Sequence, residues 1–131
     1  MPRPSHDQPT PGELEILKIL WDVGPLSGRD VMERLNEDGR GRAYTSVTSL
    51  MNVMVEKRLL KRKPDGRAFV YSAAVPRKKA LGNLLNDLIG RAFEGSANDL
   101  VAHLLNETQL SNEELTEIRK TISADRKKRQ H

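Results

Sequence analysis

The chain has 131 residues, with 22 Lys and Arg against 18 Asp and Glu, a formal net charge of +4 and no cysteine. This length holds one compact domain, or a small domain with an accessory element. The absence of cysteine excludes disulfides, thiol catalysis and thiolate metal sites. No apolar run approaches the roughly 20 residues of a membrane span, so we expect a cytoplasmic protein without membrane insertion.

The N-terminal segment predicts a disordered arm followed by a helix. Residues 1–9 contain three prolines and few apolar side chains, which is typical of a disordered arm, and they lack the apolar segment of a secretory signal. Thr10, Pro11 and Glu13 form a helix start, and Gly24 with the following proline ends the helix. The residues expected to be buried on this helix are Leu14, Leu17, Leu20 and Trp21.

A second helix is expected to begin after Ser27, which can cap it with Asp30 in the first turn. Leu26 can pack on Val31, as in a hydrophobic staple. The sequence NEDGRGR at residues 36–42 then predicts a polar loop. The buried stripe of this helix comprises Val31, Met32 and Leu35.

The stretch at residues 44–60 contains a third expected helix, which has two distinct faces. Its apolar residues recur at the 3.6-residue period of a helix. The other face is small and polar, so that a partner can approach the backbone closely. The apolar stripe is Val47, Leu50, Met51, Met54 and Val55, and the polar face is Thr45, Thr48, Ser49, Asn52 and Glu56.

Residues 59–72 predict a β-hairpin wing with a turn at Pro64-Asp65-Gly66, and Phe69 and Tyr71 on one packing face. The fold expected for residues 10–75 is therefore a mostly α, α+β winged helix-turn-helix of three helices and a wing. Residues 27–80 carry 13 Lys and Arg against 6 Asp and Glu, a local net charge of +7. Clustered positive charge is the footprint of a protein that binds a polyanion, although a charge-rich surface can also serve solubility alone.

These features predict that residues 45–58 form a recognition helix in the major groove of double-stranded DNA. Thr45 can instead merely cap the helix, and Arg67 can be a solvated turn residue. The candidates for the groove face are Thr45, Ser46, Thr48, Ser49 and Asn52, with Asn52 able to pair with adenine. The candidates for backbone contacts are Arg42, Tyr44, Lys61, Lys63 and Arg67.

Residues 76–125 predict three short amphipathic helices that form a dimerisation region, followed by a basic tail at residues 126–131. Apolar stripes without an evident partner in so small a chain favour a homodimer. The alternative is that these helices fold back on the winged domain of a monomer. The expected dimerisation residues are Leu81, Leu84, Leu85, Leu88, Leu100, Leu104, Leu115, Ile118 and Ile122.

Patterns of enzymes and metal sites are missing from the sequence. It contains no GxGxxG, P-loop, HExxH or GxSxG pattern, and His6, His103 and His131 do not have the spacing of metal ligands. We expect no catalytic activity and no cofactor. The main alternative to DNA binding is a winged-helix module that binds another protein.

The sequence resembles the penicillinase repressor (BlaI/MecI-type) family. The resemblance rests on ELEILKILW, the helix after Ser27, YTSVTSLMNVMVEKRLLKRKPDGRAFVYSAAV and FEGSANDLVAHLLNETQLSNEELTEI, and it spans Thr10 to about Ile122. It implies a dimeric transcriptional repressor whose winged domains read the half-sites of a palindromic operator. It also implies a membrane sensor-protease as inducer, cleaving in the dimerisation helices. The bond that aligns is His103-Leu104, which departs from the family's Asn-Phe. Copper-responsive relatives use C-terminal cysteines, which this chain lacks.

Overall fold

A computed structural model describes residues 8–130, so most of the arm predicted at residues 1–9 lies outside the described residues. The chain divides into two compact units, Met1–Asp87 and Leu88–His131. The division falls within helix α4 (Arg77–Ala92). The boundary that the sequence predicts after residue 75 stays a prediction.

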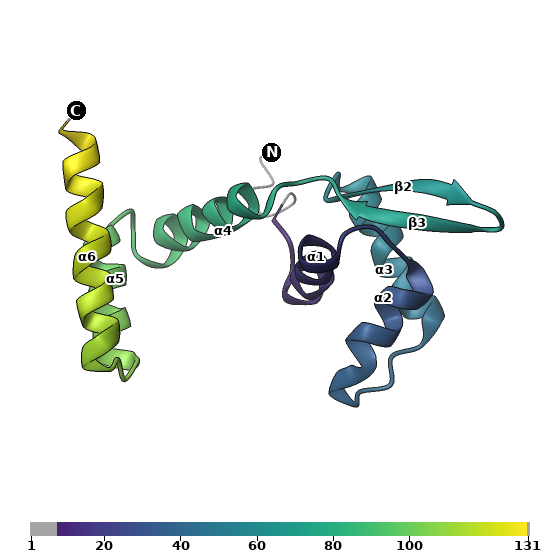
Figure 1. The fold of residues 1–131 in the computed structure, drawn as a ribbon, viewed down its shortest axis with the longest axis horizontal. Coiled ribbons are helices and arrows are strands. Elements are labelled where there is room, and N and C mark those ends of the chain that lie inside the picture. The colour runs from purple at the N-terminus through teal and green to yellow at the C-terminus, as the bar shows by residue number, and fades with distance from the viewer. Residues whose placement is uncertain (1–7, 131) are drawn as a thin grey trace. The chain divides into compact units, whose positions relative to one another are not determined.

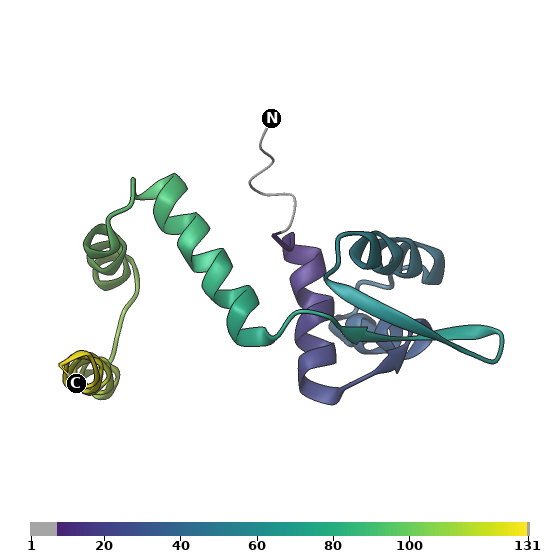
Figure 2. The same ribbon diagram turned by 90° about the horizontal axis from the view of Figure 1, so that it is seen from above.

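The first unit is a winged helix-turn-helix, as predicted (Figure 1). Three helices surround one core, and a small antiparallel sheet has the strand order β1-β3-β2. The β2–β3 hairpin extends beyond the helices in both views, as a wing does (Figure 2). The elements in chain order are α1 (Pro11–Val23), β1 (Leu26–Ser27), α2 (Gly28–Leu35), the 3₁₀ helix η1 (Asn36–Asp38), α3 (Tyr44–Glu56), β2 (Leu60–Asp65) and β3 (Ala68–Ala73).

The predicted starts of α1 and α2 are confirmed by their capping hydrogen bonds. At α1, Thr10 Oγ1 accepts a hydrogen bond from the backbone N–H of Glu13, and Glu13 Oε1 accepts one from the N–H of Thr10. These two reciprocal bonds form a capping box. At α2, Ser27 Oγ accepts from the N–H of Asp30 at 3.1 Å. The side chains of these caps therefore fix where both helices begin.

The core of the first unit is formed by one stripe of each helix and the base of the wing. The prediction for α1 was partly wrong: Ile16 is fully buried, whereas Leu14 and Trp21 are only half-buried. Trp21 lies at the edge because its indole N–H donates to the carbonyl oxygen of Val75 at 2.9 Å. The buried residues are Ile16, Leu17, Leu20, Val31, Leu35, Val47, Met51, Met54, Leu59, Leu60 and Tyr71.

The turn of the hairpin lies further along the chain than predicted. Asp65 pairs with Ala68, so Gly66 and Arg67 form the connection and Pro64 is a strand residue opposite Phe69. Gly66 has a φ of 64°, which a two-residue hairpin turn with glycine at its first position requires. Pro64 is tolerated because β2 is an edge strand of the sheet.

The second unit contains the end of α4, α5 (Ala97–Glu107) and α6 (Asn112–Arg129). Ser96 caps α5, and Ser111 with Glu114 forms the predicted capping box of α6. The last helix continues to Arg129, into the basic tail predicted at residues 126–131, and its basic side chains suit the negative end of the helix dipole. No residue of α5 or α6 is buried. None of the helices that the structure describes is both long and apolar enough to cross a membrane.

Candidate nucleic-acid interface

The N-terminus of α3 carries no side-chain cap. Ala43 occupies the N-cap position and α3 begins at Tyr44, so the alternative that Thr45 caps the helix is wrong. The first N–H groups of a helix have no partner within the helix, and they carry the positive end of its dipole. Thr45 and Ser46 are exposed beside these groups. This end of α3 can therefore accept an anion such as a phosphate.

Of the residues predicted for the polar face of α3, Thr45, Ser49, Asn52 and Glu56 are exposed, and the first three lie one turn apart along the helix. Thr48 differs from them because it is half-buried and its Oγ1 donates to the carbonyl oxygen of Tyr44 at 3.0 Å. A Cβ at Gly28 would lie 2.9 Å from Cγ2 of Thr48, so Thr48 packs closely on the start of α2. Thr48 therefore contributes to helix packing, and its predicted base contact stays untested.

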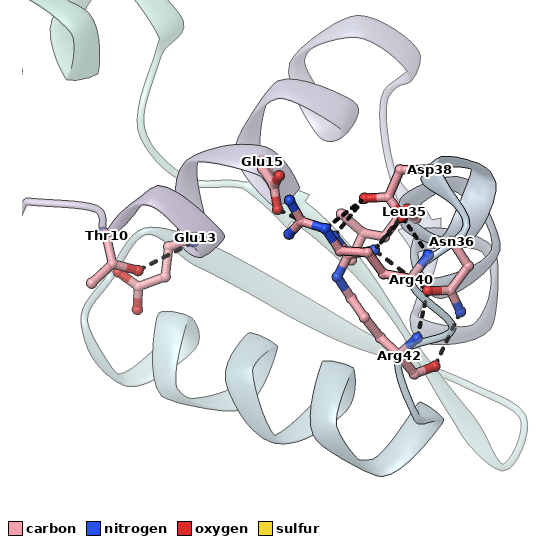
Figure 3. Close-up of polar contacts among 8 residues, drawn as sticks. All are labelled: Thr10, Glu13, Glu15, Leu35, Asn36, Asp38, Arg40 and Arg42. Carbon is pink, nitrogen blue, oxygen red and sulfur yellow. Dashed lines mark hydrogen bonds and ion pairs between the residues drawn. The ribbon is translucent and has the colours of Figure 1, made fainter.

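Arg42 lies in the connection between α2 and α3 and is tied to it by several hydrogen bonds (Figure 3). Its guanidinium donates to the carbonyl oxygen of Leu35 and to the carboxylate of Asp38, each at 2.7 Å. Its backbone N–H and C=O bond the side-chain amide of Asn36 at 2.8 and 3.0 Å. Only 19% of the Arg42 side chain is exposed, because these bonds hold it against the connection. Arg42 therefore positions the start of α3. Its contact with a DNA phosphate stays a prediction.

The Arg42 guanidinium also stabilises the charged form of Asp38. Its hydrogen bond to the carboxylate, aided by the backbone N–H of Arg40, lowers the pKa of Asp38 below the usual value of 3.8. A more distant ion pair joins Arg42 Nη2 to Glu15 of α1 at 3.7 Å. The loop that leads into α3 is thus fixed to both α1 and the end of α2.

Tyr44, a predicted backbone contact, is exposed at the first position of α3. The guanidinium carbon of Arg29 lies 5.4 Å from the centre of its ring, within the range of a cation–π contact. Arg29 is exposed in the first turn of α2 and was missed from the sequence. The signal for it was a basic residue in the first turn of the helix that precedes the recognition helix.

The wing is joined to α3 by four side chains that we call the wing clamp: Asn52, Arg62, Phe69 and Tyr71. Asn52 Oδ1 accepts from Arg62 Nη1 at 2.6 Å and from the Tyr71 hydroxyl at 2.9 Å. The guanidinium carbon of Arg62 lies 4.3 Å from the centre of the Phe69 ring. Arg62 was missed from the sequence because its face depends on the register, which pairs it with Tyr71.

The remaining wing candidates are exposed. Because side chains alternate along a strand, Lys61 and Lys63 lie on the face of β2 opposite to that of Arg62. Arg67 lies at the tip of the hairpin, in the turn. The wing therefore presents cations on the face turned away from α3 and at its end.

The predicted dimerisation residues lie on α4, α5 and α6, and none of them is buried. His103 is exposed in α5, where its ring contacts that of Phe93 at 5.1 Å between centres. The aligned bond His103-Leu104 therefore lies within a helix. The exposed members of the set are Leu85, Leu88, Leu104, Leu115 and Ile122, and the half-buried members are Leu81, Leu84, Leu100 and Ile118.

Among residues 8–130, no group of three or more His, Asp or Glu side chains is placed to hold a metal ion. The polar side chains of α3 and the cations of the wing are both exposed. Such a surface suits an extended polyanion, which is bound by many separate phosphate contacts.

The chain is similar to proteins of one known family. The family described as "Penicillinase repressor" matches residues 9–124. An uncharacterised 16.5 kDa protein of Latilactobacillus sakei is 27% identical over 115 residues, covering 88% of this chain and 78% of that protein. The penicillinase repressor of Bacillus licheniformis is 26% identical over 106 residues, covering 81% and 82%. A solution structure of the DNA binding domain of the repressor BlaI aligns with a TM-score of 0.49 and 21% identity, covering 59% of this chain and 90% of that one.

Proposed function

The chain belongs to the penicillinase repressor family, a family of DNA-binding transcriptional repressors and not of enzymes, and on this premise we propose that it represses transcription as a cytoplasmic homodimer bound to a palindromic operator. In each protomer α3 enters the major groove and the wing contacts the backbone. The observation that carries this proposal is the exposed polar face of α3, at Thr45, Ser49 and Asn52, beside an uncapped helix start.

Positive charge around this face supplies the affinity. Residues 27–80 hold 13 Lys and Arg against 6 Asp and Glu, and Lys61, Lys63 and Arg67 are exposed on the wing. Contacts of cationic side chains with phosphates release counterions, and this makes binding strong at low salt and steeply salt-dependent. Base contacts from α3 then add discrimination between sequences.

The C-terminal helices α4, α5 and α6 supply the dimer. Leucine and isoleucine side chains of α4, α5 and α6 remain exposed, which is costly for a protein that stays monomeric. A symmetric pair of these helices would cover the apolar residues of both copies. Two winged units held in this way would read half-sites about one or more DNA turns apart, which is why we expect the operator to be palindromic.

Release by a membrane sensor-protease is the induction route that the family resemblance suggests. The aligned bond His103-Leu104 lies inside α5, whereas proteolysis acts on locally unfolded backbone. Cleavage at this bond therefore requires α5 to unwind, and it would separate α6 from the winged unit. Mass spectrometry of the chain purified from induced and from uninduced cells tests this route. We expect two fragments, one ending at His103 and one starting at Leu104, from the induced cells only.

A salt titration tests the proposed function directly. The probe is a labelled duplex from the chain's own upstream region, with a shuffled duplex of the same composition as the control. We expect the upstream duplex to bind more tightly and its affinity to fall steeply as salt rises. Equal, weak binding to both duplexes, together with protein partners that stay bound at moderate salt, would favour the alternative of a protein-interaction module.

A further inference from the structure

The wing clamp determines which atoms of Asn52 are left for a partner. Arg62 Nη1 lies 2.6 Å from Oδ1 of Asn52, and the Tyr71 hydroxyl lies 2.9 Å from the same oxygen. A guanidinium can only donate hydrogen bonds, so the amide atom that faces Arg62 must be the oxygen and not the nitrogen. The contact with Arg62 therefore sets the orientation of the Asn52 amide on chemical grounds.

Both lone pairs of Oδ1 are then occupied. A side-chain amide oxygen has two acceptor positions, and Arg62 and Tyr71 each fill one of them. Tyr71 is 3% exposed, so its hydroxyl has little access to water as another acceptor. Arg62 is held in turn against the Phe69 ring. The clamp leaves only the Nδ2 group of Asn52, with its two N–H donors, for a partner outside the chain.

We propose that Asn52 is a specificity-determining residue that reads a base edge purely as a hydrogen-bond donor, through Nδ2, while Arg62 and Tyr71 act as its positioning residues. This inference rests on the proposed function, since it concerns which base α3 selects. It also differs from one expectation from the sequence, that Asn52 pairs with adenine. The usual pairing of asparagine with adenine requires Oδ1 to accept from the adenine amino group, and that oxygen is already occupied.

The base that suits a pure donor follows from the pattern of each base in the major groove. Guanine presents two acceptors, N7 and O6, whereas adenine presents one acceptor beside a donor. Thymine presents one acceptor, and cytosine presents a donor. We therefore expect guanine at the position that Asn52 contacts, with cytosine rejected most strongly because two donors would face each other.

The first test variant is Asn52→Asp, which keeps the shape of the side chain, removes its two donors and adds a negative charge. A carboxylate still accepts from Arg62 and Tyr71, so the clamp and the fold are retained. We expect the preference for guanine to disappear and bases with a donor, cytosine or adenine, to replace it. Asn112→Asp, in the exposed first turn of α6, is the control for the added charge.

The second variant, Tyr71→Phe, changes the acceptor of Asn52 and leaves its donors in place. It retains the buried ring and removes one donor from Oδ1, so the oxygen regains a free lone pair. The pairing of asparagine with adenine then becomes available. We expect the ratio of guanine to adenine at this position to fall roughly three- to tenfold, the effect of about one hydrogen bond.

The experiment is a binding selection from a randomised double-stranded DNA library with the wild type and the three variants. The inference is supported if one position of the wild-type motif loses its guanine in Asn52→Asp, shifts toward adenine in Tyr71→Phe and is unchanged in Asn112→Asp. A motif that is identical in all four proteins overturns the inference and leaves the proposed function intact. A wild type that selects no motif overturns both.

Discussion

Lys57 Nζ lies 2.7 Å from Glu13 Oε1, so an ion pair joins the end of α3 to the first turn of α1. Glu13 is the one buried charged residue in the described part of the chain, with 3% of its side chain exposed. The same oxygen accepts from the N–H of Thr10. The pair therefore holds the C-terminal end of the helix that carries the candidate interface, while the Arg42 network holds the other end.

Removal of one partner should destabilise the winged unit. In Glu13→Ala the bond from the Thr10 N–H to the Glu13 carboxylate and the ion pair are lost together, and the Lys57 ammonium, which is 22% exposed, keeps no carboxylate partner. We expect the free energy of unfolding to fall by about 2–4 kcal/mol. Urea denaturation measures this loss. The control is Glu117→Ala, which breaks an exposed ion pair with Lys120 and should change the free energy of unfolding by less than about 1 kcal/mol. An equal loss in both variants would contradict the role of burial.

Close packing between α2 and α3 gives a second prediction. A methyl group at Gly28 would lie 2.9 Å from Cγ2 of Thr48, a stiff β-branched side chain. Gly28→Ala should therefore lower the free energy of unfolding by about 1–3 kcal/mol. Thr48→Ser removes the opposing methyl, so the double variant should regain most of this loss in urea denaturation. Simple addition of the two single effects would show that the contact is not the cause.

Arg42 offers a test of positioning against phosphate contact. Because its guanidinium bonds Leu35 and Asp38, Arg42→Ala should weaken DNA binding by loosening the start of α3. The slope of log affinity against log salt should then stay as in the wild type. Arg67→Ala, at the exposed tip of the wing, should weaken all sequences alike and reduce that slope by about 1. A reduced slope in Arg42→Ala would instead identify Arg42 as a phosphate contact.

The same network predicts a dependence of stability on acid pH. The hydrogen bond from Arg42 lowers the pKa of Asp38 in the folded state below 3.8, its usual value. The charged form therefore stabilises the fold above pH 3.8, and this contribution is lost as the pH falls through the lowered pKa. The difference in unfolding free energy between the wild type and Asp38→Asn should shrink below pH 3.8. A difference that stays constant down to the acid limit would contradict this assignment.

Patterns local to one element predicted much of the fold. The helix starts at Thr10, Ser27 and Ser111 follow from capping residues, which act within one turn of the chain. The buried stripe of α3 follows from its helical period, with Met51 and Met54 fully buried. The turn of the wing was misplaced because the Pro-Asp-Gly sequence suits a turn by itself, whereas the register of the strands places Gly66 and Arg67 there.

Contacts between side chains of different helices and strands could not be predicted from the sequence. Arg62 was missed because its face of the strand follows from pairing with Tyr71, nine residues away across the hairpin. Arg42 was expected to contact DNA because it is basic and precedes the recognition helix, yet its hydrogen bonds go to Leu35, Asn36 and Asp38. Whether a charged side chain meets a partner within the chain depends on the packing of helices, which no single stretch of sequence determines.

The apolar stripe of α6 leads to the last prediction. Leu115, Ile118 and Ile122 lie on one side of the helix, and Ile122 is 55% exposed. Ile122→Asp would place a charge in the proposed dimer contact, and burying an unpaired charge is costly. We expect this variant to sediment as a monomer and, because the second half-site is lost, to bind the operator roughly 100-fold more weakly.

The matched control for this variant is Ala124→Asp, which adds the same charge on the opposite side of α6. It should remain dimeric and bind the operator like the wild type. If both variants become monomers, the helix itself has been disrupted and circular dichroism should show a loss of helix in both. If both stay dimeric, the stripe of Ile122 is not the contact, and the exposed leucines of α4 and α5 must then supply it. A wild type that sediments as a monomer while bound to the operator would contradict the proposed dimer altogether.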